Sequence, residues 1–323
     1  SIVSGAVIER IRISAFGVLA IAIGSVFWSI DASWGWHFDG WMVKVLGYHD
    51  AYASGVIHAV CGGFALGVLV VLGPRIGKFV NGIPQNIGPR NPWLVTLGLF
   101  LIYTGFWGFY AACNIPIFDA GADSGAGVTY FTATNIYAAP TTLSGVTMNF
   151  LMSLAGGLLA GYVVAKGDPF WTYSSGLAGI ICASAGNDLY HPLQSMVIAM
   201  VGVVIMYKLH YWVERRFKID DAVGAVAVHG YAGVVGLLIC GFVLWGYPSS
   251  TYEGYAAINP LGMLAGAVIM FGVLGFLPGY VIALILNSVG QLRIPREVEI
   301  AGQDYLAMEA AKKDEETVAS AEQ

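Results

Sequence analysis

Two histidines in matching surroundings are the residues of this sequence best suited to chemistry. The stretch from Asp50 reads DAYASGVIHAVCGG and the stretch from Asp221 reads DAVGAVAVHGYAGV. In each, a histidine, His58 or His229, follows the aspartate by eight residues, and a glycine follows the histidine by four. A buried neutral imidazole has one donor and one acceptor, and leaving either unpaired costs about 1–3 kcal/mol. We therefore expect each histidine to meet a polar partner inside its apolar segment.

The chemistry open to such a pair is proton transfer. An imidazole, whose ordinary pKa is about 6.5, accepts or relays protons near neutral pH. Asp50 and Asp221 stand where helices are expected to start, and a carboxylate there caps free amides and complements the helix dipole. Capping alone would explain both aspartates, so ligand binding is a second interpretation for them.

The elements that must position these residues are membrane helices. Of the 323 residues, 57% are hydrophobic and 11% are charged, against about 25% charged in soluble domains. Eight apolar runs approach or exceed the roughly 20 residues that cross a hydrocarbon core of ~30 Å. They lie approximately at 12–30, 50–73, 92–115, 127–165, 170–187, 190–213, 221–246 and 261–290. The sequence predicts an all-α, polytopic membrane helix bundle, with a transmembrane domain at 1–292 and a polar tail at 293–323.

Basic residues predict the orientation, because lysine and arginine concentrate in cytoplasmic loops. Fourteen of the 15 fall before the first run or in every second connection after it, and Lys44 alone falls in the other set. This distribution predicts a multi-pass protein of the cell membrane with its C-terminal tail in the cytoplasm. The opposite loops are mildly acidic, and an acidic mouth favours cations.

With this orientation, the second run enters the membrane from outside and the seventh enters from the cytoplasm. The two histidine motifs are then antiparallel copies, as in transporters built from inverted repeats with a site near the midplane. Eight residues of helix rise about 12 Å, so each histidine would lie that far inside its own face of the membrane. We expect the two imidazoles to meet near the centre and to satisfy each other.

Other chemistries find little support. The four cysteines lie in apolar runs without CxxC spacing, and the sequence has no phosphate-binding glycine loop, HExxH motif or nucleophile elbow. The remaining histidines show no shared spacing and are interpreted as structural or surface residues: His37, His49, His191 and His210. We expect no metal, no cofactor and no enzyme activity. The net charge of −5 comes largely from the tail and does not indicate a nucleic-acid partner.

The sequence resembles the ammonium transporter family, the Amt/Mep/Rh proteins. The similar segments are SGAVIERIR, ASGVIHAVCGG, GFWGFYAA, SSGLAGII, IDDAVGAVAVHGYAG and LRIPREVE, in family order. The resemblance implies an inverted repeat of five plus five helices within eleven, a homotrimer with one pore per subunit, and ammonium or ammonia as substrate. On that template the chain begins at the end of the third helix, so we expect the first helices to be missing from it.

The resemblance also implies roles for individual residues. His58 and His229 would be the paired pore histidines, Trp36 the vestibule tryptophan, with Trp34 as the alternative, and Phe109 a gate phenylalanine. Asp50 would be the acidic residue of the vestibule. Phe106, Trp107 and Cys113 would also belong to the outer vestibule.

The segment GFWGFYAAC departs from the family pattern. Phe106 and Trp107 exchange order, and Cys113 replaces a serine whose hydroxyl would be the better acceptor. An ammonium sensor without significant flux is the alternative function. A nitrogen-regulatory PII protein at the cytoplasmic face is a further partner that the resemblance implies.

Overall fold

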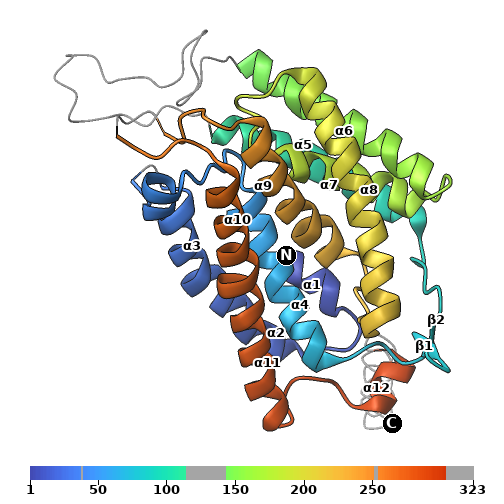
Figure 1. Cartoon of the computed structure of the whole chain (residues 1–323). Helices are drawn as coiled ribbons and strands as arrows, with labels where there is room; N and C mark the ends of the chain where they lie inside the picture. Colours follow the sequence, from blue (N-terminus) through green and yellow to red (C-terminus); the bar gives the residue numbers. More distant parts are fainter. Residues whose placement is uncertain (38, 114–142, 251–253, 303–323) are drawn as a thin grey trace, which may run out of the picture.

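A computed structural model describes residues 1–37, 39–113, 143–250 and 254–302 of the chain. Helices dominate these residues and lie side by side in one bundle (Figure 1). The strands in this part of the chain are β1 (Phe79–Val80) and β2 (Ile83–Pro84), which form one short antiparallel hairpin. The predicted all-α class is therefore confirmed.

Seven helices of the described residues are long and apolar enough to span a membrane. Four of these spans contain a π-helical stretch, where the backbone makes a wider turn. In chain order the seven spans are Ile13–Gly35 (α2, Ile13–Ile21; π, Ala22–Phe27; α3, Trp28–Gly35), Ser54–Leu72 (π, Ser54–Ala59; α4, Val60–Leu72), α5 (Pro92–Ala112), α6 (Leu143–Val164), α8 (Pro192–Phe217), Val226–Val243 (π, Val226–Tyr231; α9, Ala232–Val243) and Pro260–Ser288 (α10, Pro260–Ala267; π, Val268–Phe276; α11, Leu277–Ser288). Shorter elements are α1 (Ile2–Val7), a π turn at Met42–Leu46, α7 (Pro169–Ala183) and α12 (Arg296–Ala301).

These helices differ from the predicted runs in three places. The fifth run corresponds to α7, whose 15 residues make a helix of only about 22 Å. The fourth run, 127–165, is described only from residue 143 on. The helices that carry the histidines begin later than predicted, with π-helical stretches at Ser54 and Val226. Each aspartate stands before its helix and accepts a hydrogen bond from an amide near the helix start. The depth of 12 Å expected from continuous helix at Asp50 and Asp221 therefore does not apply.

The start of the predicted tail packs against the helical bundle. The Arg293 guanidinium donates to the carbonyls of Leu72 and Pro74 and pairs with the Glu299 carboxylate at 2.9 Å. The backbone amide of Ile76 donates to the same carboxylate. The first residues after the predicted boundary at 293 therefore still contact the helical bundle. Residues 303–323 of the tail lie outside the described residues.

The two histidine helices cross in the middle of the bundle at glycine contacts. A Cβ placed on Gly62 would lie 2.3 Å from the backbone of Gly230, and a Cβ on Gly233 would lie 2.3 Å from the carbonyl of Ser54 and 3.1 Å from the amide of Ala59. Small residues allow helices in lipid to approach this closely. Equivalent glycines of the two motifs thus pack against the opposite helix, as the inverted repeat predicts.

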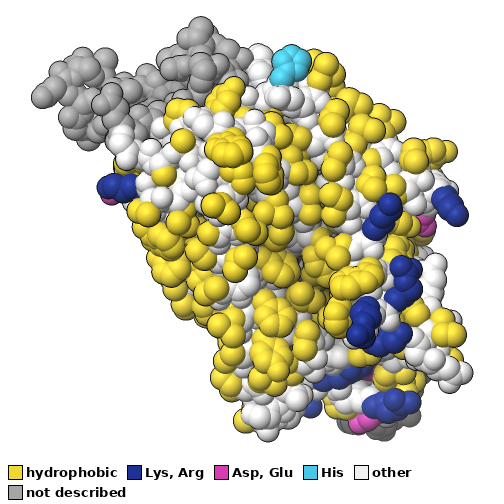
Figure 2. All heavy atoms as spheres, in the orientation of Figure 1, with side chains coloured by type: hydrophobic (Ala, Val, Ile, Leu, Met, Phe, Trp, Pro, Cys, Tyr) yellow, Lys and Arg dark blue, Asp and Glu magenta, His cyan; other side chains and the backbone are white. Residues whose placement is uncertain are grey.

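The outer surface is that of a membrane protein. Hydrophobic side chains cover most of the face seen in Figure 2. Large hydrophobic side chains that are mostly exposed on the protein include Ile13, Trp93 and Leu261. Lys and Arg side chains on this face gather mainly toward the end that carries α12 (Figures 1 and 2). The described surface therefore combines an apolar belt with a basic end.

Candidate functional site

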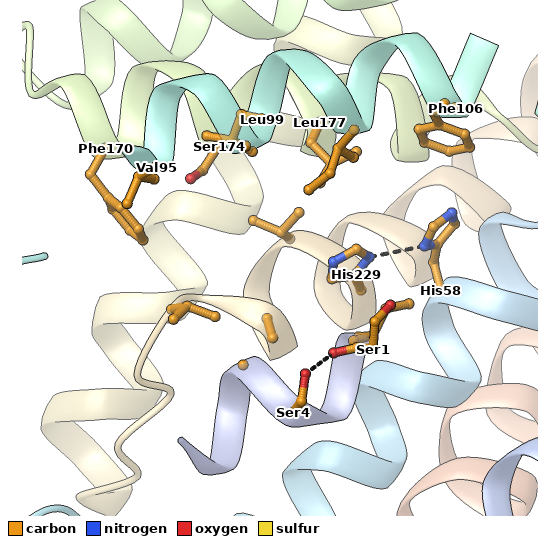
Figure 3. A pocket seen from close by; sticks show the side chains of 18 residues that line it. Ser1, Ser4, His58, Val95, Leu99, Phe106, Phe170, Ser174, Leu177 and His229 are labelled. Atoms are coloured by element: carbon orange, nitrogen blue, oxygen red, sulfur yellow. Dashed lines mark hydrogen bonds between the residues drawn. The ribbon is translucent and has the colours of Figure 1, made fainter. Parts of the chain in front are cut away.

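The structure brings His58 and His229 into direct contact. Their Nδ1 atoms lie 2.9 Å apart, and the two rings are nearly parallel, with centroids 5.1 Å apart and an angle of 20° between their planes. Each histidine lies within a π-helical stretch, Ser54–Ala59 or Val226–Tyr231. Figure 3 shows the two rings meeting edge to edge from different helices. Each imidazole is thus the polar partner that the other one needs.

This contact assigns opposite roles to the two rings. A hydrogen bond between two Nδ1 atoms requires one ring to donate and the other to accept. In two neutral rings, the Nε2 of the donating ring is then an acceptor and the Nε2 of the accepting ring carries a hydrogen. The Nε2 of His58 is buried and has no hydrogen-bond partner in the described part of the protein. The pair therefore presents one donor and one acceptor to a small polar molecule.

Both histidines line a cavity of about 590 Å³ whose wall is otherwise mostly apolar. Phe106 of α5 lies over His58, with ring centroids 5.3 Å apart. Toward the other end, the wall is formed by Leu99, Leu177 and Phe170, with Ser174 as a polar exception (Figure 3). A neutral molecule fits this wall better than an ion, because a charge without partners is costly in such surroundings.

An aromatic cluster continues from Phe106 away from the histidines. Phe106 packs on Phe109 with centroids 5.8 Å apart, and Phe109 packs on Trp36 at 5.9 Å. The Trp36 indole donates a hydrogen bond of 3.3 Å to the carbonyl of Ala51, next to Asp50. Trp34, the alternative vestibule tryptophan, packs instead against Trp41. Trp36 is therefore the tryptophan that joins the predicted site residues.

Two other predicted residues of α5 are placed differently. Trp107 is 40% exposed and donates to the Thr147 hydroxyl of α6 at 3.1 Å. Its role as a vestibule residue stays a prediction. Cys113 is a free, half-buried thiol one turn beyond Phe109, at the end of α5.

Asp50 and Asp221 make the contacts of helix caps. Asp50 Oδ2 accepts hydrogen bonds from the amides of Gly55 and Val56, at 2.8 and 3.0 Å, and Asp221 Oδ2 accepts one from the amide of Ala227 at 3.1 Å. Burial raises the pKa of both carboxyl groups to about 6, although the capping amides lower it. Because Asp50 is only 4% exposed, its carboxylate would attract a nearby cation from a distance and not by direct contact.

Sequence reasoning missed several polar groups beside this site. The Tyr48 hydroxyl donates to Asp50 Oδ2 at 3.1 Å. The Asn187 amide donates to the hydroxyls of Tyr110 and Ser153, both at 3.0 Å, which links α5, α6 and the end of α7. Asp31 lies buried within the first span. Only Asp31 had a signal in the sequence, as a charged residue near the end of an apolar run.

The other histidines have structural contacts. His191 caps α8 through its Nδ1, His37 Nδ1 accepts from the amide of Asp39, and His49 pairs with Asp188 at 3.1 Å. His210 Nδ1 lies 3.8 Å from Asp221 Oδ2. Within the described residues, no group of three or more His, Cys, Asp or Glu could hold a metal ion.

Comparison with known proteins identifies the family. The model of the Ammonium Transporter Family matches residues 1–313. Ammonium transporter Amt2 of Methanocaldococcus jannaschii is 29% identical over 98% of this chain and 68% of its own length. Amt1 of the same organism is 27% identical, over 98% and 74%.

Solved structures give the same result. A Sensor Amt Protein is similar with a TM-score of 0.77 and 25% identity, over 94% of this chain and 72% of that one. The structure of Rh50 of Nitrosomonas europaea is similar with a TM-score of 0.66 and 18% identity, over 97% of this chain and 77% of that one. At this identity the similarity is one of fold. The chain belongs to the Ammonium Transporter Family, and it is accordingly a multi-pass membrane protein of a transport family and not an enzyme.

Proposed function

We propose that this protein transports ammonium across the membrane by conducting ammonia past the histidine pair. One observation carries the proposal: the Nδ1 atoms of His58 and His229 lie 2.9 Å apart in the wall of a cavity that is otherwise mostly apolar. Membership of the family supports ammonium as the substrate.

The hydrogen-bonding capacity of the pair suits ammonia. Ammonia has one lone pair and three N–H groups, so it accepts from one Nε2–H and donates to the other Nε2 in the tautomers described above. Ammonium has four N–H groups and no acceptor, and it would bring an unpaired charge into the apolar cavity, which is costly. When one Nε2 takes up a proton, the shared hydrogen can move to the other ring and that ring can release its Nε2 hydrogen, which exchanges the roles of the two Nε2 atoms. The pair is therefore suited to guide ammonia and to relay a proton.

Recruitment of ammonium is assigned to the aromatic cluster on the Asp50 side. The faces of Trp36 and Phe109 attract a cation by cation–π contact, worth about 0.5–2 kcal/mol. The negative charge of the Asp50 carboxylate also attracts the cation. The Cys113 thiol occupies the position at which a stronger acceptor would bind an N–H group of ammonium. Ammonium would transfer its proton there to a water molecule of the vestibule, ammonia would pass Phe106 to reach His58, and the histidine pair would relay a proton across the site.

The distribution of basic residues supports an orientation with the recruitment side outside and the C-terminal tail in the cytoplasm. A transmembrane domain at 1–292, a tail from 293 on, a homotrimer and binding of a PII-type protein at the cytoplasmic face are further proposals. They follow from the family resemblance. Size-exclusion chromatography with light scattering tests the trimer, and pull-down with a purified PII protein tests the partner.

Sensing is the second candidate function. The observation in its favour is the similarity to the structure titled Sensor Amt Protein, at a TM-score of 0.77. A sensor would bind ammonium without sustained flux. Calorimetric binding of ammonium by a protein that gives neither an ammonium-dependent current nor ammonium uptake in proteoliposomes would favour sensing over transport.

The deciding experiment compares ammonium-elicited currents and uptake in proteoliposomes for wild type, His58→Ala and His229→Ala. His37→Ala is the matched control, because His37 is an exposed histidine outside the pair. We expect either pore substitution to lower the saturable rate by at least about tenfold, the equivalent of 1.4 kcal/mol. Unchanged saturation and rate in both variants would remove the pore assignment.

A further inference from the structure

Asp31 is a buried carboxyl group that the proposed pathway does not use. It lies in α3, within the first membrane span, and is 1% exposed. Its Oδ1 atom is buried and has no hydrogen-bond partner, and no Lys, Arg or His nitrogen of the described residues lies within 4.0 Å of the carboxyl group. An ionisable group at such a place is costly and is a candidate for function.

Contacts above and below Asp31 fix its depth in the membrane. Gly35, one turn toward the end of α3, packs on the helix of His58, where an added Cβ would lie 3.3 Å from Val56. Phe27, one turn the other way, packs on Phe64 of the same helix, with centroids 6.4 Å apart. Residues four apart lie on one face of a helix. Asp31 therefore faces the middle of the segment between Val56 and Phe64.

Asp31 therefore lies at about the same level of the helix as His58. His58 and Val60 lie between the two contacts in the sequence, and residues two apart point to nearly opposite sides of a helix. Asp31 thus stands behind the helix whose other side presents His58 to the cavity. The ionisable groups that interact with it electrostatically are Asp50, Tyr48 and Cys61.

We propose that Asp31 is a membrane-embedded proton-binding site that carries its proton, and is therefore neutral, at neutral pH. A buried carboxylate without a paired cation is far costlier than the buried neutral acid, so these surroundings favour the protonated form. With Asp31 neutral, Asp50 is the carboxyl group left to attract a cation on the recruitment side.

Infrared spectroscopy of the purified full chain tests the protonation state without any need for transport. At pH 7.5, wild type should show a carbonyl band of a buried, protonated carboxylic acid, and Asp31→Asn should lose the intensity of one acid. Asp39→Asn is the matched control, since Asp39 is an exposed aspartate paired with Lys44 at 3.0 Å, and it should keep the band. A band of full intensity in Asp31→Asn would overturn the proposal.

The role of Asp31 during transport rests on the proposed function and is tested by transport. At neutral pH, Asp31→Asn should transport like wild type, because asparagine replaces a neutral acid. A variant that loses transport at neutral pH as Asp50→Asn does would show that Asp31 is used as an anion, against the proposal.

Folding of the variant is checked by thermal unfolding. Removing a proton site that is neutral in the folded protein should leave the unfolding temperature unchanged or higher, whereas a large decrease would argue for an ionised, paired Asp31. Loss of transport in His58→Ala has no bearing on the infrared band. Failure of the pore proposal and failure of the Asp31 proposal are therefore distinguishable.

Discussion

Substitution of Gly62 by alanine tests whether the close crossing of the two repeats holds the histidine pair together. The new methyl carbon would lie 2.3 Å from both the Cα and the N of Gly230, whereas ordinary contact begins at 3.4 Å. The obstructing atoms are backbone, which cannot move aside as a flexible side chain does. The two helices must therefore separate by roughly 1 Å, and overpacking of this kind costs about 1–3 kcal/mol.

The separation acts directly on the histidines. Their Nδ1 atoms are 2.9 Å apart, so an added separation of roughly 1 Å would exceed the distance at which a hydrogen bond forms. We expect Gly62→Ala to lower the thermal unfolding temperature in detergent. We also expect the saturable transport rate in proteoliposomes to fall by about tenfold or more, as for a loss of 1.4 kcal/mol.

Gly17→Ala is the matched control, because a Cβ at Gly17 meets nothing within 4 Å. This variant should match wild type or be slightly more stable, since alanine favours the helix. Equal stability and transport in Gly62→Ala and Gly17→Ala would refute the reasoning. It would mean that the crossing yields without disturbing the pair.

Three more substitutions have defined outcomes. Arg75→Ala removes a 2.8 Å ion pair with the buried Asp220 and should cost about 3 kcal/mol of stability. Burial opposes ionisation of Asp220, but hydrogen bonds from Arg75 hold its pKa below the usual range. The stability difference between wild type and Arg75→Ala should thus be complete at pH values above the pKa of Asp220 in the unfolded chain. It should vanish as the pH falls through the lower pKa of Asp220 in the folded protein, and a difference that does not depend on pH would contradict this. His49→Gln removes an imidazole whose pKa is raised, because the Asp188 carboxylate outweighs the effect of burial. The stability difference between wild type and His49→Gln should be complete at pH values below the pKa of histidine in the unfolded chain. It should disappear as the pH rises through the raised pKa of His49 in the folded protein, and a difference that grows with pH would refute the ion pair. Cys113→Ser supplies a better acceptor, so a hydrogen bond of about 0.5–1.5 kcal/mol should lower the half-saturating ammonium concentration roughly two- to tenfold; an unchanged value in a flux titration would separate Cys113 from recruitment.

Much of the fold follows from the sequence because membrane helices leave a strong signal. Backbone groups in hydrocarbon must be paired within the helix or in a closed barrel, so a long apolar run predicts a helix without knowledge of its neighbours. Seven of the eight predicted runs contain helices long enough to span, within the described residues. The matched spacing of Asp50 with His58 and of Asp221 with His229 also predicted that the histidines would meet.

The site was harder to predict, because the direction of a side chain depends on the rotation of its helix. Successive residues of a helix differ in direction by about 100°, so Phe106 packs on His58 while its neighbour Trp107 bonds to Thr147 of α6. The order of residue types in GFWGF carries no information about that rotation. The resemblance alone suggests Trp107 as a vestibule residue, and that role stays a prediction.

What the sequence by itself determined is the position of most of the apolar spans, their repeat and the pairing of two histidines, because hydropathy and spacing are properties of the chain alone. The tertiary structure decided where the helices begin, since Asp50 and Asp221 cap them from outside. It also placed π-helical turns at both histidines and buried Asp31 within the first span. These features depend on contacts between segments far apart in the chain, and no local pattern of residues specifies them.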